Sequence, residues 1–348
     1  MHLYRLNQPG SPPPLASAGR YVPHPAPAPL LELPPQTAPS VVTIGSFDGV
    51  HLGHQALIRK VVQAARQQGM QSVLLTFDPH PQAVLSPNPP ALLTSLAQRL
   101  ALFDGLGLDL VGMIPFSKEM AGWPPETFLQ AYLFDRFEVG ALWVGYDFAF
   151  GKGRAGNPQM LRGVAQQKGF GVEVVEAVKS QDGEIISSTR IRQLLAQAQF
   201  DQARALLGHS YSIERRVVTG AGKGRQLGFP TLNLNPEGVL PLPYGVFAFW
   251  ARVIAAPLGE SQKGFPGEWV PAVGNYGLRP TVTQDMTPVL EVHLLEGHPD
   301  WYDHVVEVVP MRQMRGEKRF ESLEALKTQV HRDMDEARRW LLEAPTPG

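Results

Sequence analysis

The sequence contains no cysteine. This absence excludes disulfide bonds, thiolate catalysis and cysteine-based metal clusters, and it suits a reducing compartment. No apolar run reaches the ~18 residues that a membrane-spanning helix needs. Prolines also follow Arg5, where a secretory signal would place its apolar stretch. We therefore expect a cytoplasmic protein that does not cross a membrane.

A long run of one charge sign is missing as well. The 31 Lys and Arg residues nearly balance the 32 Asp and Glu residues, which gives a formal net charge of −1. A basic stripe is the usual footprint of a protein that binds nucleic acid. A DNA or RNA partner is therefore disfavoured.

The chain has 348 residues, whereas single domains cluster near about 100 to 150, so two domains are expected. It is rich in turn-forming residues, with 34 glycines and 33 prolines, yet 43% of residues are hydrophobic and no triplet period is present. These features argue against a collagen-like or disordered chain. Prolines crowd residues 1–40, which we interpret as an extended tail because proline blocks helices and central strands.

Between residues 41 and 186, short β-branched runs alternate with amphipathic stretches. Such alternation predicts parallel strands joined by helices, which is a doubly wound α/β domain of the Rossmann-like kind. The predicted strands cover residues 41–45, 72–77, 108–115, 141–145 and 172–175. The predicted helices cover residues 53–68, 96–103, 125–136 and 158–168.

Residues 187–210 are expected to form a helical connector, with one helix over 189–207. In residues 211–348, strand-like runs then follow one another without helices, which predicts an antiparallel barrel. Apolar residues four positions apart predict a terminal helix over 323–342. The predicted strands cover residues 212–220, 245–254, 269–273, 289–295 and 304–311.

A glycine-rich turn joins the first predicted strand to its helix, at the edge where open α/β sheets bind ligands. It reads Gly-Ser-Phe-Asp-Gly-Val-His-Leu-Gly-His over residues 45–54. Its glycines allow close backbone approach, and free N–H groups at a helix start favour an anion. His51 and His54 are three positions apart, so both imidazoles are expected on one side of the first helical turn, where they could donate to a phosphate chain.

Other interpretations of this turn stay open from spacing alone. Asp48 could cap the helix while both histidines are ordinary surface residues. A metal site of Asp48, His51 and His54 is a weaker alternative, because no further ligand is evident. The turn is neither a P-loop nor a zinc-protease helix, since it lacks Gly-Lys-Ser/Thr and His-Glu-x-x-His.

A second polar run, Ile-Ser-Ser-Thr-Arg-Ile-Arg, covers residues 186–192. Alone it fits a helix cap at Ser188 or Thr189 with solvated arginines. Together with residues 45–54, however, it resembles the two signatures of the nucleotidyltransferase superfamily. Residues 76–81 (Thr-Phe-Asp-Pro-His-Pro) and 144–154 resemble the flavin adenylyltransferase branch specifically.

Adenylyl transfer needs a phosphate oxygen of the acceptor to attack the α-phosphate of ATP, with pyrophosphate leaving. Positioning and charge neutralisation carry such a reaction, and no protein nucleophile is required. The resemblance implies that His51 and His54 hold the triphosphate. It implies further ATP or phosphate contacts at Gly45, Phe47, Asp48, Gly53, Ser187, Ser188, Thr189, Arg190 and Arg192, and flavin contacts at His80, Asp147 and Phe148.

Closely spaced glycines recur after residue 217, at Gly220, Gly222 and Gly224. Their N–H groups could cradle phosphates, although such loops often serve only as hairpin turns. Thr231 and Asn233 are two positions apart, so their side chains face the same way on an extended segment. Hydroxyl and amide oxygens suit Mg²⁺.

The stretch at 290–296, Leu-Glu-Val-His-Leu-Leu-Glu, alternates apolar and polar residues, which predicts a half-exposed strand. Glu291 and His293 share its polar face. A functional alternative is that Glu291 takes the proton from an alcohol that attacks the γ-phosphate of ATP, a role that contributes about 10² to 10⁴-fold.

Residues 228–234, Gly-Phe-Pro-Thr-Leu-Asn-Leu, resemble the signature of riboflavin kinase, a six-stranded antiparallel barrel, and later segments match in order. The resemblance implies that Thr231 and Asn233 bind Mg-ATP and that Glu291 is the base acting on the ribityl 5′-hydroxyl. Further implied contacts are Gly222, Lys223 and Gly224 to ATP and Arg315 to flavin. One departure is Asp-Trp-Tyr-Asp at 300–303, where the family has Asp-Leu-Tyr-Gly. Another is Glu-Gly at 296–297 in place of Asp-Phe.

Taken together, these segments resemble the bacterial bifunctional riboflavin kinase/FAD synthetase family. The resemblance implies that the barrel converts riboflavin and ATP to FMN, that the α/β domain converts FMN and ATP to FAD and pyrophosphate, and that Mg²⁺ takes part. Neither nucleic acid nor membrane is an expected partner, and the sequence indicates no oligomeric state. Alternatives are an adenylyl- or cytidylyltransferase for another phosphorylated substrate, a non-catalytic flavin-binding module, and an RNA-binding protein.

Overall fold

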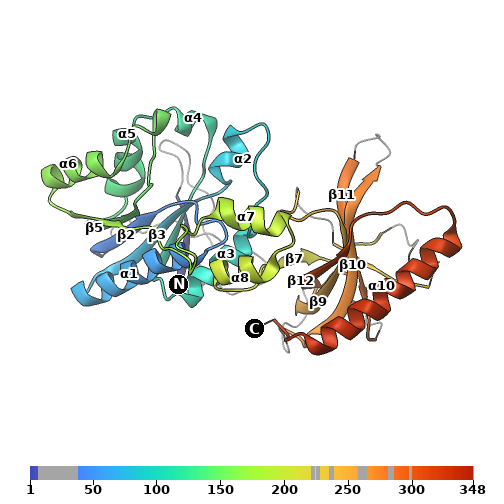
Figure 1. Cartoon of the computed structure of the whole chain (residues 1–348). Helices are drawn as coiled ribbons and strands as arrows, with labels where there is room; N and C mark the ends of the chain where they lie inside the picture. Colours follow the sequence, from blue (N-terminus) through green and yellow to red (C-terminus); the bar gives the residue numbers. More distant parts are fainter. Residues whose placement is uncertain are drawn as a thin grey trace. The chain divides into compact units, whose positions relative to one another are not determined.

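The computed structural model describes residues 1–6, 38–220, 224, 228–234, 239–257, 265–280, 286–297 and 300–347. Contacts within the chain divide it into two compact units (Figure 1). The first unit comprises residues 1–90 and 96–187, and the second comprises residues 91–95 and 188–348.

The first unit is built on a six-stranded sheet with the order β1-β4-β3-β2-β5-β6, and every pairing in it is parallel. Strands β2 and β4 are buried along their whole length, as expected for strands that are covered on both faces. The strands are β1 (His2–Arg5), β2 (Ser40–Ile44), β3 (Gln71–Phe77), β4 (Leu110–Ile114), β5 (Val139–Gly145) and β6 (Gly171–Val175).

Helices cover both faces of this sheet (Figure 1). On one face, α1 (Leu52–Gln68) and α3 (Leu96–Gly105) form an apolar core with the strands. On the other face, α5 (Pro125–Leu129), the π-helix η1 (Gln130–Phe134) and α6 (Pro158–Lys168) form a second core. Three short helices complete the unit: α2 (Pro81–Leu85), α4 (Lys118–Ala121) and the 3-10 helix η2 (Lys152–Arg154). The predicted doubly wound α/β fold is confirmed.

The structure differs from the sequence predictions at two places in this unit. Residues 2–5, which were assigned to the tail, form β1 because Leu3 and Leu6 are buried and the backbone pairs with β4; residues 7–37 lie outside the described residues. The prediction of a single α-helix over 125–136 is wrong, because the helix becomes π-helical at Gln130. Four- and five-residue elements are too short to show a period in the sequence.

The second unit contains a six-stranded antiparallel sheet with the order β7-β12-β9-β10-β11-β8. The sheet curls until its two edges meet, because Val218, just beyond β7, bridges Asn233 of β8 with an N–O distance of 3.0 Å. The predicted antiparallel six-stranded barrel is confirmed. Its strands are β7 (Ile213–Arg216), β8 (Leu232–Asn233), β9 (Gly245–Ala255), β10 (Val270–Pro280), β11 (Met286–Leu294) and β12 (Val305–Arg315).

The C-terminal helix α10 (Leu323–Glu343) begins at Ser322, whose hydroxyl accepts from the N–H of Ala325 at 3.1 Å. Its Ala337 and Leu341 pack into a core with Val246 and Trp250 of β9. The predicted terminal helix is therefore confirmed.

The connector helix predicted over 189–207 is wrong as a single helix. It forms α7 (Ser188–Ala196) and α8 (Phe200–Leu207), separated at Ala198, which has a left-handed φ of 53°. Alanine and glutamine are good helix formers, so the local sequence carries no signal for this break.

We expect Asp109→Ala to weaken the first unit. Its carboxylate accepts from the Ser72 amide at 2.9 Å and from the Ser72 hydroxyl at 2.6 Å, which ties the starts of β3 and β4 together. Ser72 is buried, so losing this acceptor lowers the free energy of unfolding by about 1 to 2 kcal/mol. Urea denaturation measures the change, with the exposed Glu173→Ala as the control. Equal stabilities for wild type and Asp109→Ala would contradict this account.

Candidate active sites

The turn between β2 and α1 is buried and held in a strained conformation. Phe47, Gly49 and Val50 have left-handed φ values of 51°, 80° and 39°. For a β-branched residue such as Val50, this conformation costs of order 1 to 3 kcal/mol. Phe47, Asp48, Val50 and His51 are all buried. Strain of this kind persists only where the surroundings fix it, and it is concentrated at functional sites.

Two imidazole rings stack at the end of this turn. His51 and His54 have ring centroids 3.6 Å apart and planes inclined by 19°, so they lie together as their spacing predicts. His51 caps α1, because its Nδ1 accepts from the backbone N–H of His54 at 3.3 Å. The alternative in which Asp48 caps the helix is therefore wrong. Since Nδ1 of His51 accepts, its proton is on Nε2, where it can be donated to a ligand.

The environment of His54 favours the neutral ring. Burial lowers the pKa of His54 well below its ordinary value of 6.5, and the adjacent His51 lowers that pKa further. Its Nδ1 is buried and has no hydrogen-bond partner among the described residues. Within the described ranges, no group of three or more His, Cys, Asp or Glu residues is placed to hold a metal, so the alternative metal site at this turn gains no support.

Other motifs of the sequence meet this turn. The carbonyl oxygen of Ser46 accepts from Thr76 Oγ1 at 3.2 Å and from Nη1 of Arg99 at 2.9 Å. A Cβ at Gly53 would lie 3.1 Å from the His51 ring and 3.8 Å from the carbonyl oxygen of Ile186. The segments that begin at residues 45, 76 and 186 therefore come together at the carboxyl end of β2.

The 186–192 segment spans the boundary between the two units. Ile186 and Ser187 belong to the first unit, and Ser188, Thr189 and Arg190 open α7 in the second. Arg192 Nε donates to the carbonyl oxygen of Ala91 at 2.6 Å, which fastens residues 91–95 to α7. One donor of this arginine is thus engaged with the backbone.

A row of aromatic rings lies beyond the carboxyl ends of β3 and β5. Ring contacts run from Phe148 through Phe150 and Phe128 to Phe77, with centroids 5.2, 5.6 and 6.3 Å apart. Phe148 is one of the predicted flavin contacts. The row connects the 76–81 segment with the 144–154 segment, and its inner rings, Phe128 and Phe150, are buried in the core.

The other two predicted flavin residues of this unit flank that row in the sequence. His80 is buried and caps α2, because its Nδ1 accepts from the N–H of Gln82 at 3.2 Å. Its other ring nitrogen therefore carries the proton. A Cβ at Gly145 would lie 3.3 Å from a carboxylate oxygen of Asp147, so the Asp147 side chain turns back over the end of β5.

In the second unit, strand pairing brings the predicted kinase residues together. Glu291 of β11 lies directly opposite Asn233 of β8, so both side chains project from the same face. Thr231 directly precedes β8 and is two residues before Asn233. His293 Nδ1 lies 2.7 Å from the carbonyl oxygen of Pro230 and must donate, since a carbonyl only accepts. His293 thus fastens the chain just before Thr231.

Glycines make room at this second site. A Cβ at Gly220 would lie within 2.4 Å of the Asn233 amide group, and a Cβ at Gly224 would lie 2.5 Å from the Phe229 carbonyl oxygen and 3.2 Å from Thr231 Oγ1. No larger residue fits at either position without movement. Gly222 and Lys223, predicted as ATP contacts, lie outside the described residues.

Arg315, a predicted flavin contact, pairs with Asp333 of α10. Its Nε lies 3.0 Å and its Nη2 2.8 Å from Oδ2 of Asp333, and Asp333 also accepts from Gln329 at 2.8 Å. The pair holds α10 against the end of β12.

At residues 300–303, where this sequence departs from the riboflavin kinase segment that it resembles, the backbone contains a left-handed residue. Asp303, which stands where the family has glycine, takes a left-handed φ of 60°. Aspartate tolerates this region better than most residues, so the chain takes a glycine-type conformation there without a glycine.

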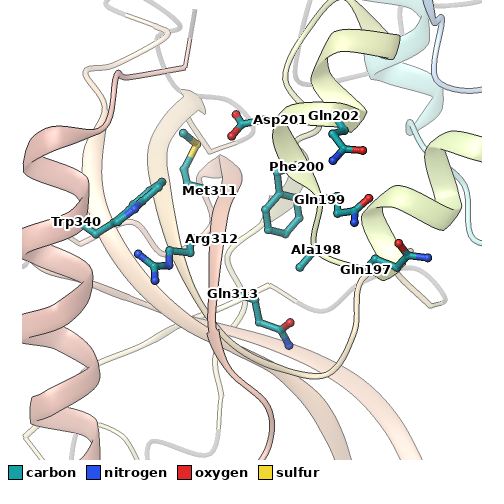
Figure 2. Close-up of a pocket in the computed structure, with 10 residues that line it drawn as sticks. All are labelled: Gln197, Ala198, Gln199, Phe200, Asp201, Gln202, Met311, Arg312, Gln313 and Trp340. Atoms are coloured by element: carbon teal, nitrogen blue, oxygen red, sulfur yellow. The ribbon is translucent and has the colours of Figure 1, made fainter. Parts of the chain in front are cut away.

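A pocket of about 520 Å³ opens elsewhere in the second unit. Figure 2 shows Trp340 reaching toward it from α10 and Phe200 from the start of α8. The remaining lining residues are Gln197, Ala198, Gln199, Asp201, Gln202, Met311, Arg312 and Gln313. None of the predicted site residues is among these lining residues, all of which belong to the described part of the chain.

The first unit thus has the parallel α/β fold expected of a nucleotidyltransferase, and the second has the antiparallel barrel expected of a riboflavin kinase. The FAD synthetase family matches residues 33–190, and the riboflavin kinase family matches residues 207–341. The bifunctional riboflavin kinase/FMN adenylyltransferase of Pseudomonas fluorescens is 37% identical, over 91% of this chain and 97% of that protein. Its Escherichia coli K12 counterpart is 36% identical, over 84% of this chain and 90% of that protein. The chain therefore belongs to the family of bifunctional riboflavin kinase/FMN adenylyltransferases.

A solved structure is similar over most of the chain. A Streptococcus pneumoniae protein, described as a macrolide-efflux protein, superposes with a TM-score of 0.71 at 26% identity, covering 87% of this chain and 95% of that one. In the described part of this chain, no helix is both long enough and apolar enough to cross a membrane. The predicted family and enzyme class are confirmed, with flavins and ATP as the substrates that this class implies.

The lowered pKa of His54 predicts a pH dependence of stability. Below about pH 6.5 the unfolded chain takes up a proton at His54 more readily than the folded chain does. The free energy of unfolding therefore decreases as the pH falls from that value toward the folded pKa. Replacing His54 with Asn removes this contribution, so the pH dependence of unfolding becomes shallower.

Urea denaturation at a series of pH values measures the slope. His2→Asn changes an exposed histidine of the same unit and is the matched control. Identical slopes for wild type and His54→Asn would show that folding does not shift this pKa.

Proposed function

We propose that the second unit phosphorylates riboflavin and the first unit adenylylates the resulting FMN, with the catalytic and binding residues identified from the sequence. The observation that supports this proposal is that each unit brings together residues that the sequence predicts to take part in its reaction. In the first unit they are the stacked pair His51 and His54. In the second they are Glu291 and Asn233, opposite one another on paired strands.

In the first unit, an FMN phosphate oxygen attacks the α-phosphorus of ATP, and pyrophosphate departs as the α–β bridging bond breaks. His51 and His54 donate N–H groups to the triphosphate, and the neutral His54 ring favoured by burial retains one N–H for this bond. Further ATP contacts of this unit are Gly45, Phe47, Asp48, Gly53 and Ser187. Phosphate contacts at Ser188, Thr189, Arg190 and Arg192, which open α7, rest on the sequence motif alone. Preorganised donors of this kind stabilise charge that develops on the leaving group.

The flavin ring of FMN lies against the aromatic row in this account. Phe148 ends that row, and its ring stacks on Phe150 with an interplanar angle of 28°. His80 and Asp147 supply the polar contacts to the flavin. His80 is suited to donate, because its Nδ1 already accepts and the proton is on the other nitrogen.

In the second unit, Glu291 accepts the proton of the ribityl 5′-hydroxyl as that oxygen attacks the γ-phosphorus and ADP departs. Thr231 and Asn233 offer a hydroxyl and an amide oxygen, which are hard donors that suit Mg²⁺. Close packing on Gly220 and Gly224 fixes both side chains. When bound there, Mg²⁺ neutralises phosphate charge. Gly222, Lys223 and Gly224 complete the ATP contacts, and Arg315 acts on the flavin.

We assign residues 41–186 to the adenylyltransferase domain, 187–210 to the connector and 211–348 to the kinase domain. We also propose a cytoplasmic enzyme without a nucleic-acid or membrane partner. Its net charge of −1 and its lack of cysteine support this assignment.

Glu291→Gln separates the two activities. The amide cannot accept the hydroxyl proton, so phosphorylation of riboflavin falls by about 10² to 10⁴-fold. Adenylylation of supplied FMN stays at the wild-type rate. Chromatography of FMN and FAD after incubation with Mg-ATP measures both, with the exposed Glu324→Gln as the control. Equal loss of both activities would exclude Glu291 as the base of one reaction.

The double substitution His51→Ala with His54→Ala is expected to lower adenylyl transfer, the activity of the first unit. Removing two donors from the triphosphate lowers FAD formation from FMN by at least about 10²-fold. Riboflavin phosphorylation continues, because the second unit is unchanged, and circular dichroism melts report whether the first unit is folded. Unchanged FAD formation in a folded double variant would refute the histidine assignment.

A further inference from the structure

Arg99 is a buried arginine that has no role in the proposed reaction. It lies on α3 and is 3% exposed, with its Nε buried and unpartnered among the described residues. Its neighbours Leu100 and Phe103 belong to the apolar core on that face of the sheet. An apolar side chain would pack at such a position without the desolvation cost of a guanidinium.

The position of Arg99 indicates what it does. Its Nη1 donates to the carbonyl oxygen of Ser46 at 2.9 Å, across 53 positions of the sequence. The carboxylates of Asp48 and Asp78 oppose the effect of burial on the Arg99 pKa, so both act electrostatically on the guanidinium. Arg99 thus interacts with the turn after β2 and with the segment after β3.

Ser46 is the last residue before the strained part of the turn. Left-handed backbone follows at Phe47, Gly49 and Val50, and His51 comes directly afterwards. The far end of the turn is fixed by Gln55, whose Nε2 donates to the Val50 carbonyl oxygen at 2.9 Å. The near end is fixed at Ser46, by Arg99 and by the longer bond from Thr76.

We propose that Arg99 is a positioning residue for adenylyl transfer: by holding the Ser46 carbonyl, its guanidinium fixes the strained turn and thereby the imidazoles of His51 and His54. This inference rests on the proposed function of the first unit. A displacement of about 1 Å in a positioned group can cost about 10²-fold in rate. The loss of Arg99 therefore acts on turnover without removing any group that touches substrate.

The test uses the full chain with Arg99→Met, which keeps the length of the side chain and removes its donors. FAD formation from FMN and Mg-ATP is expected to lose about 10- to 100-fold in kcat, while riboflavin phosphorylation is unchanged. Arg99→Lys keeps a charged donor and is expected to restore most of the lost kcat. A role in stability alone would leave kcat per folded molecule at the wild-type value.

Arg136→Met is the matched control. Arg136 is a partly buried arginine of the same unit, and its Nε donates to the Ala131 carbonyl oxygen at 2.9 Å, so its loss removes a comparable bond away from the turn. It is expected to leave the kcat of FAD formation unchanged. Circular dichroism melts of all variants give the folded fraction.

Two failures are distinguishable. A wild-type chain that makes FMN but no FAD would overturn the proposed function of the first unit. A wild-type chain that makes FAD, together with a folded Arg99→Met of equal kcat, would overturn the positioning role alone.

Where Arg99→Met does not fold, Thr76→Val removes the other donor to Ser46. Its expected loss is about fivefold in FAD formation, and a folded Thr76→Val with wild-type kcat would overturn the inference.

Discussion

The carbonyl oxygen of Ser46, held by two donors from different parts of the chain, is the contact on which the first site depends. Thr76 brings β3 to this oxygen and Arg99 brings α3. Between this contact and the start of α1, the backbone takes conformations that most side chains avoid. This conformation places two stacked imidazole rings, with centroids 3.6 Å apart, on one helical turn. A relaxed turn would present them separately, and the triphosphate of the proposed reaction would lose its paired donors.

In the second site, the side chains are positioned by strand pairing and not by a strained turn. Here the register of two antiparallel strands places Glu291 opposite Asn233. A slip of one residue would turn one of these side chains to the other face of the barrel. His293 fixes the preceding segment through Pro230, and Gly220 allows Asn233 to approach the backbone closely. Strand register therefore positions the side chains of the proposed kinase site, and the strained turn positions those of the proposed adenylyl-transfer site.

The sequence predicts most of the architecture because the long elements have clear periods. The helix over 158–168 and the terminal helix from residue 323 follow directly from their patterns. The four residues of β1 and the break at Ala198 escape prediction, since no local preference marks them. Residues with motif signals, such as His51 and Glu291, are predicted as site residues before the fold is known. Arg99 is not, because an arginine in an amphipathic helix normally indicates a solvated face.

The chemistry fixes the order in which the two sites act. Adenylyl transfer needs a phosphate oxygen on the flavin as its nucleophile, and riboflavin has only a hydroxyl at that position. Phosphorylation of that hydroxyl therefore supplies the oxygen atom that later attacks in adenylyl transfer. Because each reaction consumes its own ATP, ATP enters twice on the way from riboflavin to FAD. The unit that is second along the chain performs the first reaction.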